Sequence, residues 1–355
     1  MKDVSFSGSY DASDVIFLLK PVTLEPTNVT LKEALIQSGA RHYSEMLSPE
    51  APPTPEYLAL YEAALVRNSA RLASHIAALA TTLDARSPAG HEIVLASLVR
   101  AGTPIAILIA RALRRLGREV AHYGVSIIRD RGIDRVALDY ILQRHNQDDV
   151  VFVDGWTGKG AIAIELRASL AGRMDPFLLV VADPAGQADL SATHDDYLIA
   201  SGLLNSVVSG LVSRSLLSTD IVGASDFHAC VSFDALASFD LSRNFVNYID
   251  ALVQSASPIA DDAYARRAAH AACNNMVSLI MADAQTNRRN LVKPGIAEAT
   301  RAMLRRVPDR LYIRDVNDPD VQHLMHLADT KGVAIHPLNH AGHFRAVAVI
   351  RSIEA

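Results

Sequence analysis

The pattern of apolar and polar positions changes near residue 57. Residues 1–57 show no sustained period, and prolines at positions 52, 53 and 55 exclude regular structure beside them. From residue 57 to residue 83, apolar side chains recur at steps of three and four, which predicts a helix. The chain is therefore expected to begin with an irregular extension and one long helix.

Short apolar runs then alternate with helical periods. Residues 91–99, 150–153 and 176–182 are nearly continuous apolar runs, as expected of strands buried on both faces. A fourth strand is expected near 120–128. Helical patterns are expected near residues 104–116, 133–145 and 160–171. Alternating strands and helices predict an α/β fold, an open parallel sheet covered by helices.

The last third divides into three parts. Residues 195–285 are rich in Ala, Leu and Ser and are predicted to be mainly helical. From Arg288 to Arg314, eight Lys and Arg residues oppose two acids, a net charge of 8 − 2 = +6. Residues 311–355 show a strand, helix, strand, strand pattern. We therefore expect a first domain over 1–285 with helical additions, a basic linker over 286–308 and a small α/β domain over 309–355.

Composition limits the classes of protein. Half of the 355 residues are hydrophobic, enough for a large core, and the formal net charge of −5 argues against a general polyanion binder. Two cysteines form no disulfide framework and favour a cytoplasmic location. The first residues lack the pattern of a signal peptide, and no run of about 18 uncharged apolar residues exists, so we expect no membrane contact.

The segment 150–161, VVFVDGWTGKGA, predicts a phosphate-binding loop. An apolar strand carries Asp154 at its tip, and a helix follows a turn of small residues. Converging backbone N–H groups and a helix N-terminus attract phosphate, and a carboxylate there suits ribose hydroxyls. The expected loop consists of Gly155, Trp156, Thr157, Gly158, Lys159 and Gly160. The segment departs from the Walker A motif at two positions. The first glycine of a dinucleotide-binding fingerprint would lie too far from the end of the strand. A turn that binds no ligand stays an alternative.

A second loop of this kind follows the strand at 91–99. It consists of Val99, Arg100, Ala101, Gly102 and Thr103, in which the glycine permits close backbone approach and the arginine supplies a fixed charge. Two such loops at the tips of parallel strands suit a ligand with a phosphate at one end and a diphosphate at the other. The alternative for Arg100 is an ordinary surface arginine.

Other acids and histidines are candidates for binding an acceptor molecule. Asp183 ends the third buried strand, Asp195 and Asp196 follow a loop, and Asp226 with His228 resembles an acid/base pair. The alternatives are solvated strand ends and structural hydrogen bonds.

The two cysteines and the histidines offer less. Cys230 lies two residues after His228 and Cys273 three after His270, outside any nucleophile motif. Cysteine proteolysis is therefore kept as a minor alternative. The histidines near the C-terminus lack accompanying ligands, so we expect no metal bound directly by protein side chains.

Several segments resemble one family. They are residues 42–47, 97–105, 153–162, 197–199, 201–214, 226–228 and 292–306. They are similar to type I phosphoribosyltransferase-like proteins of tellurite-resistance-associated gene clusters, some of which carry the label "cysteine protease StiP". The resemblance implies the sheet of a type I phosphoribosyltransferase, 5-phosphoribosyl diphosphate with Mg²⁺ carried by the diphosphate, and catalytic roles for Asp154 and Arg100 in making a nucleoside-like metabolite. Gly155 replaces the second acid of that signature, which keeps a non-catalytic phosphoribosyl sensor as the alternative.

The resemblance also covers the end of the chain. From about residue 309, the sequence is similar to the Pelota-type RNA-binding domain fused to such proteins. This implies RNA as an alternative partner and an RNA-linked regulator as an alternative function. The acceptor is unknown, and we expect a homo-oligomer.

Overall fold

A parallel six-stranded sheet forms the centre of the first domain. The computed structural model describes residues 6–259, 265–340 and 342–353. Every strand pair in this sheet is parallel, and the strand order is β1-β4-β3-β7-β8-β9. Its strands are β1 (Ile16–Phe17), β3 (Ile93–Leu98), β4 (Val120–Val125), β7 (Val150–Trp156), β8 (Phe177–Ala182) and β9 (Leu190–Thr193). The predicted α/β class with a parallel sheet is confirmed.

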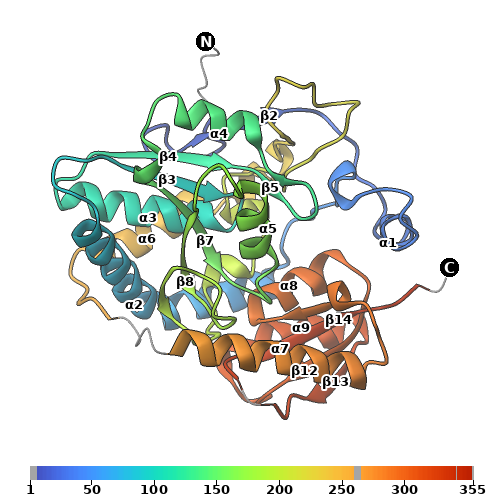
Figure 1. The fold of residues 1–355 in the computed structure, drawn as a ribbon. Coiled ribbons are helices and arrows are strands. Elements are labelled where there is room, and N and C mark those ends of the chain that lie inside the picture. The colour runs from blue at the N-terminus through green and yellow to red at the C-terminus, as the bar shows by residue number, and fades with distance from the viewer. Residues whose placement is uncertain (1–5, 260–264, 341, 354–355) are drawn as a thin grey trace.

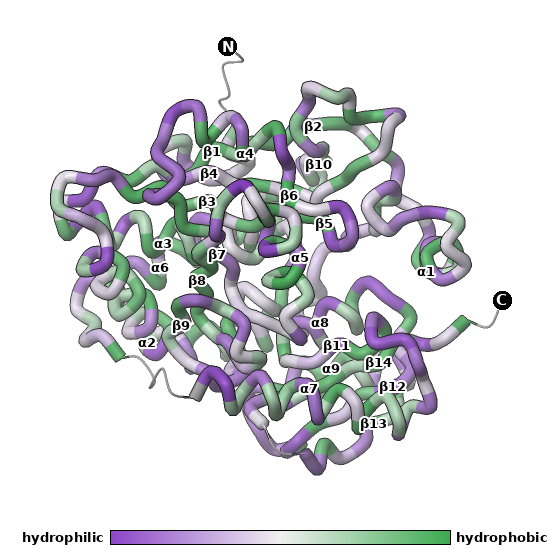
Figure 2. Tube along the Cα trace, viewed as in Figure 1, coloured by the Kyte–Doolittle hydropathy of each residue, from purple (hydrophilic) through white to green (hydrophobic). Residues whose placement is uncertain are grey.

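Helices cover both faces of this sheet (Figure 1). Alternate side chains of a strand point to opposite faces, so β7 places Val151 and Val153 in one apolar cluster and Val150 and Phe152 in the other. One face packs against α2 (Pro55–Arg86), α3 (Gly102–Arg115) and α6 (Ser242–Val253), and the other against α4 (Arg135–Leu142) and α5 (Ala161–Leu170). Its central strands β3, β7 and β8 are mainly hydrophobic (Figure 2), as expected of buried strands.

The C-terminal domain is a four-stranded sheet with helices. Its strand order is β11-β14-β12-β13, in which only β12 and β13 are parallel. Its elements are α7 (Ala265–Asp283), β11 (Val292–Pro294), α8 (Ile296–Arg305), β12 (Pro308–Ile313), α9 (Gln322–Lys331), β13 (Ala334–Pro337) and β14 (Ala346–Ile350). The small C-terminal α/β domain is thus present. It packs against the first domain beside β8 and α2 (Figure 1).

The basic segment 286–308 is not a linker. It forms β11, which pairs with β14, and α8, whose Ile296, Ala299 and Met303 are fully buried. The sequence prediction was wrong because it rested on the charge of the segment and overlooked the apolar positions 296, 299 and 303, which recur at steps of three and four.

Two other local predictions were wrong. Residues 195–241 consist of loops, 3₁₀ turns and short bridges, although their Ala and Leu content favours helix. Leu211 and Gly210 there adopt positive φ, which excludes a continuous helix, and buried packing overrides propensity. In the extension, α1 (Val29–Gln37) forms after the Asn28 cap and packs against the C-terminal domain through Glu33 and Arg306. The remaining strands are short pairs, β2 (Lys20–Pro21) with β10 (Ala229–Cys230) and β5 (Ile127–Ile128) with β6 (Gly132–Ile133).

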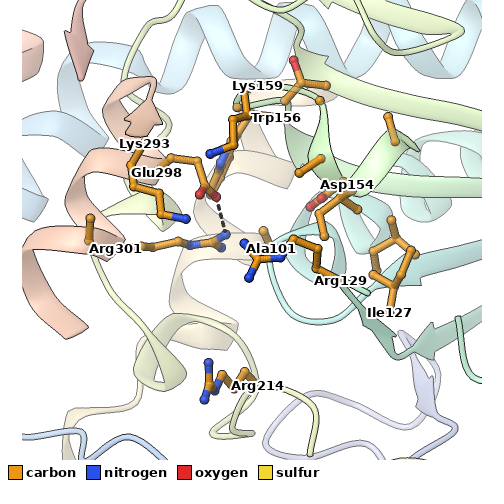
Figure 3. A pocket seen from close by; sticks show the side chains of 18 of the residues that line it. Ala101, Ile127, Arg129, Asp154, Trp156, Lys159, Arg214, Lys293, Glu298 and Arg301 are labelled. Carbon is orange, nitrogen blue, oxygen red and sulfur yellow. Dashed lines mark ion pairs between the residues drawn. The ribbon is translucent and has the colours of Figure 1, made fainter. Parts of the chain in front are cut away.

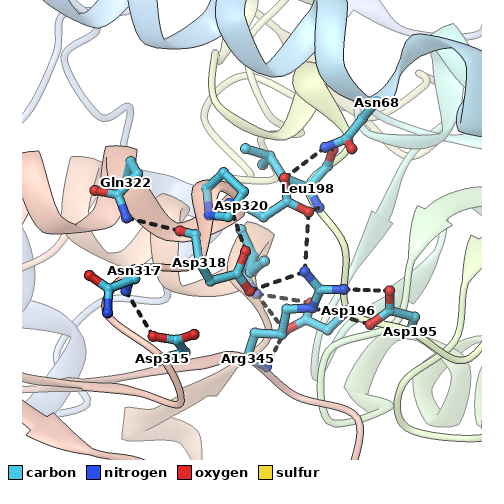
Figure 4. Close-up of polar contacts among 12 residues, drawn as sticks. Asn68, Asp195, Asp196, Leu198, Asp315, Asn317, Asp318, Asp320, Gln322 and Arg345 are labelled. Carbon is cyan, nitrogen blue, oxygen red and sulfur yellow. Dashed lines mark hydrogen bonds and ion pairs between the residues drawn. The ribbon is translucent and has the colours of Figure 1, made fainter.

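A cluster of charges joins the domains (Figure 4). Arg345 of the C-terminal domain forms ion pairs with Asp195 at 2.6 Å, Asp318 at 3.1 Å and Asp320 at 3.3 Å. Its backbone N–H donates to Asp196, which also accepts from the backbone N–H of Ile296. The first residues of β14 and α8 are therefore fixed to the loop that follows β9.

Candidate functional site: a basic pocket between the domains

The two predicted loops meet at one pocket of about 290 Å³. They follow β3 and β7, which are neighbours in the sheet, so their carboxyl ends lie at the same edge. The opposite wall is β11 and α8 of the C-terminal domain (Figure 3). The site is therefore an interdomain pocket, which the sequence alone did not predict.

The loop after β7 is shaped by contacts as well as by its glycines. Gly160 adopts φ +82° and starts α5. A Cβ on Gly158 would lie 2.8 Å from Cγ of Glu298, so this glycine lets the C-terminal domain approach. Thr157 donates its hydroxyl to Asp183 at 2.6 Å, so this hydroxyl is engaged within the fold. Asp154, Trp156, Thr157, Gly158, Lys159 and Gly160 line the pocket, and Gly155 does not.

The side chain of Arg100 anchors the loop after β3 to other segments of the first domain. Arg100 is 7 % exposed, pairs with Glu50 at 2.5 Å and donates to the Val212 carbonyl. It is therefore not an ordinary surface arginine, and its charge is compensated. Val99, Arg100 and Ala101 line the pocket, whereas Gly102 and Thr103 begin α3 behind it.

Basic side chains dominate the lining, with nine against the two carboxylates of Asp154 and Glu298. The nine are Lys32, Arg100, Arg129, Lys159, Arg214, Lys293, Arg301, Arg305 and Arg306. Figure 3 shows Arg129, Arg214, Lys293 and Arg301 directed toward a common space. Such a concentration of positive charge suits an anion.

Pairing does not account for all of this charge. Arg301 pairs with Glu298 at 3.5 Å, and Lys159 donates to the carbonyls of Arg289 and Val292. Within residues 6–259, 265–340 and 342–353, neither the ammonium group of Lys293 nor the guanidinium group of Arg305 forms a hydrogen bond or ion pair. Both residues are partly buried, and cations withdrawn from water favour a partner of opposite charge, so their position suits an anion.

The pKa shifts reflect this imbalance. Burial lowers the pKa of Lys293 to about 8 and, together with Arg100 and Arg301, holds that of Arg305 well below its usual value. Burial raises the pKa of Asp154 to about 7, although Arg301 opposes this. A bound anion would reverse the mutual repulsion of the cations.

The predicted acceptor-binding residues lie outside the pocket. Asp183 accepts from Thr157 and from the backbone N–H groups of residues 187 and 188. Asp195 and Asp196 belong to the Arg345 cluster described above. Asp226 pairs with Lys20 at 2.7 Å, and His228 is hydrogen-bonded to Ser126 at 2.7 Å. All five therefore have partners within the fold, as the structural alternatives expect, and none of them lines the pocket.

Sequence reasoning missed residues that come from distant parts of the chain. Lys32 and Tyr43 belong to the extension, Arg129 follows β5, and Arg214 lies in the loop region. No local motif marks them. Lys293 and Arg301 lie in the basic stretch from Arg288 to Arg314, and the net charge of this stretch is the signal that marks them.

The cysteines are poor nucleophiles in this structure. Cys230 is fully buried, and burial raises the pKa of its thiol to about 12. Burial likewise raises the pKa of Cys273 to about 11, although Arg289 opposes this. A thiolate is the reactive species, and neither thiol forms it readily at neutral pH. Neither sulfur is hydrogen-bonded to a histidine among the described residues.

The described residues offer neither a metal-binding cluster nor a membrane-spanning helix. No group of three or more His, Cys, Asp or Glu side chains there could hold a metal ion. No described helix is long and apolar enough to cross a membrane. The Mg²⁺ expected with a diphosphate stays a prediction.

Comparison with known proteins assigns the family. Residues 8–250 match the family described as "Tellurite-like stress resistance cysteine protease StiP". The chain belongs to this family. It is 42 % identical over 366 residues to "Cysteine protease StiP" of Acinetobacter baylyi (strain ATCC 33305 / BD413 / ADP1), a match that covers 98 % of this chain and 95 % of the relative. Residues 271–352 match the PELOTA RNA binding domain.

These matches correct the functional prediction. The expected pentosyltransferase acting on 5-phosphoribosyl diphosphate is wrong, because the family and the relative are both named as cysteine proteases and no family that binds this compound matches. The expected link to tellurite resistance and the Pelota domain are confirmed. The prediction failed because glycine-rich loops at strand tips suit many anions and do not specify a reaction.

Proposed function

We propose that this stress-resistance protein binds RNA, whose phosphate groups enter the basic pocket between the domains. The observation that carries the proposal is the excess of nine basic over two acidic side chains around one pocket. Lys and Arg contacts with phosphates supply most of the affinity of nucleic-acid binding.

The C-terminal domain supports this choice of anion. Lys293, Arg301, Arg305 and Arg306 lie within residues 271–352, the part that matches the PELOTA RNA binding domain. They lie on β11, on α8 and at the residue that follows α8, and they face the α/β domain across the pocket. RNA bound there would contact both domains.

Aromatic rings in the pocket suit bases. The Arg301 guanidinium lies 4.8 Å from the centre of the Trp156 ring, and the Arg214 guanidinium lies 5.0 Å from that of Tyr43. Both rings line the pocket. Aromatic and guanidinium planes are the groups on which unpaired RNA bases stack. The rings of Trp156 and Tyr43 belong to the first domain, so it supplies the stacking surfaces of which the C-terminal domain has few.

The test is fluorescence anisotropy with a labelled single-stranded RNA of about 12 nucleotides. We expect binding that weakens steeply from low to physiological salt. The Arg305→Met variant should bind at least about tenfold more weakly, with a salt slope lower by about one.

Arg310→Met is the matched control. Arg310 belongs to the same basic stretch but pairs with Asp309 outside the pocket, so its loss should change affinity less than about twofold. Absence of binding by the wild-type protein at low salt, or equal effects of the two variants, would contradict the proposal.

The names of the relatives favour a second candidate, cysteine proteolysis. Cys230 is the cysteine within the matched residues 8–250, so it is the candidate nucleophile. Its buried thiol would have to become exposed before it could react. Degradation of labelled casein that is lost in Cys230→Ala and kept in Cys273→Ala would establish this activity. Equal degradation by all three proteins, or none, would exclude Cys230 as the nucleophile.

A further inference from the structure

The lining of the pocket includes a lysine that is hydrogen-bonded to a serine. Lys32 lies on α1 and Ser48 in the loop that precedes α2, and both line the pocket. Lys32 Nζ is hydrogen-bonded to Ser48 Oγ. Their residues are 3 % and 6 % exposed, so the pair is shielded from bulk water.

Among the residues that the structure describes, no carboxylate forms an ion pair with Lys32, although a buried ammonium normally has such a partner. Its neighbour on α1, Glu33, is engaged by Arg306 and Gln37. The other charged groups that act on Lys32 are the cations Arg214, Arg305 and Arg306. A buried amine among cations is more stable when neutral, and a neutral amine accepts a proton.

We propose that Ser48 and Lys32 form a nucleophile and general-base pair that cleaves a phosphate ester bound in the basic pocket. The assignment of a phosphate ester as the substrate rests on the proposed function, in which phosphate enters this pocket. The pairing of serine with lysine does not depend on it.

The reaction has two balanced steps. Ser48 Oγ transfers its proton to Lys32 Nζ and attacks phosphorus, an Oγ–P bond forms, and the bond from phosphorus to the leaving oxygen breaks. The Lys32 ammonium returns the proton to that oxygen. Water then attacks phosphorus and gives a proton to Lys32, and the Oγ–P bond breaks. The Lys32 ammonium returns that proton to Oγ, which releases phosphate and restores both the Ser48 hydroxyl and the neutral amine.

The surrounding charges suit this chemistry. Arg214, Arg305 and Arg306 lie close enough to affect Lys32, so they also lie near a phosphate that Ser48 could attack. Fixed cations stabilise the charge that develops on the phosphoryl oxygens. Binding of the anion also offsets their repulsion of the Lys32 ammonium, which makes this amine a stronger base when substrate is present.

The test uses the full chain with p-nitrophenyl phosphate. We expect release of p-nitrophenol and, after acid quench, a phosphoryl adduct on the peptide that contains Ser48, detected by mass spectrometry. Ser48→Ala should abolish both. Ser38→Ala, at the end of the same helix as Lys32 and exposed, is the control and should retain both.

The Lys32→Arg variant distinguishes the ability of Lys32 to accept a proton from its positive charge. Arginine keeps the positive charge but cannot accept a proton at neutral pH, so turnover should fall at least about 100-fold. Binding of inorganic phosphate should change less than about threefold. In the wild type, turnover should rise with pH through about 6, because burial and the neighbouring Arg214 lower the pKa of Lys32 to about 6.

Labelling with a fluorophosphonate covers the case in which Lys32→Arg does not fold. It modifies activated serines and should react with Ser48 in the wild-type protein. No release of p-nitrophenol, unchanged release in Ser48→Ala, or turnover of p-nitrophenyl acetate without turnover of the phosphate would each overturn the inference. RNA binding that persists while Ser48 proves inert refutes this inference alone. Cleavage of the phosphate ester without RNA binding refutes the proposed function but supports the roles of Ser48 and Lys32.

Discussion

Replacing Arg345 by methionine should weaken the attachment of the C-terminal domain. Arg345 pairs with Asp195, Asp318 and Asp320, and its removal leaves these carboxylates close together. Loss of one partner of a fully buried ion pair costs about 3–5 kcal/mol. The Arg345 side chain is 24 % exposed and Arg71 still pairs with Asp195, so we expect a loss of about 2–3 kcal/mol.

Urea unfolding followed by tryptophan fluorescence measures this effect. The single tryptophan, Trp156, lies under Arg301 of the C-terminal domain, so its emission reports separation of the domains. In the Arg345→Met variant we expect the fluorescence change at lower urea than the loss of helical circular dichroism.

A matched substitution shows whether the position matters. Arg173→Met also removes an arginine from an ion pair, but Arg173 is 39 % exposed and its partner Asp139 is 50 % exposed. Such pairs contribute little, so the change should stay within about 0.5 kcal/mol. A loss below about 1 kcal/mol for Arg345→Met, or equal losses for both variants, would refute the reasoning.

Three further outcomes are expected. Burial raises the pKa of Asp154 to about 7, so the native state binds more protons than the unfolded state and stability falls as pH rises from about 4 to about 7. In urea titrations at pH 5 and pH 8, Asp154→Asn should reduce this pH dependence and add about 1–3 kcal/mol of stability at pH 8. Part of the pH dependence should remain, because burial also raises the pKa of Asp196 to about 7. Because burial raises the pKa of both thiols, to about 12 and about 11, iodoacetamide should modify the native protein at least about 100-fold more slowly than the urea-unfolded protein, as followed by mass spectrometry. A Cβ on Gly102 would lie 2.1 Å from the Val153 carbonyl oxygen, so Gly102→Ala should destabilise the protein by about 1–3 kcal/mol in denaturant unfolding, and an unchanged midpoint would contradict that contact.

The sequence by itself determined the α/β class and the two loops. Strands β3, β7 and β8 are built on short apolar runs, which are typical of parallel strands buried on both faces. The loops after β3 and β7 could be placed because neighbouring parallel strands end at one edge. These are local patterns or direct consequences of them.

Which charges have a partner, among the residues that the structure describes, depends on the three-dimensional arrangement. Arg100 is compensated by Glu50, fifty residues earlier, and Thr157 is engaged by Asp183, whereas Lys293 and Arg305 are left facing the pocket. The pairing of Lys32 with Ser48 likewise joins segments with no shared motif. Whether a polar side chain supports the fold or faces a ligand depends on distant partners, because electrostatic and hydrogen-bonding energies are set by separation in space rather than along the chain.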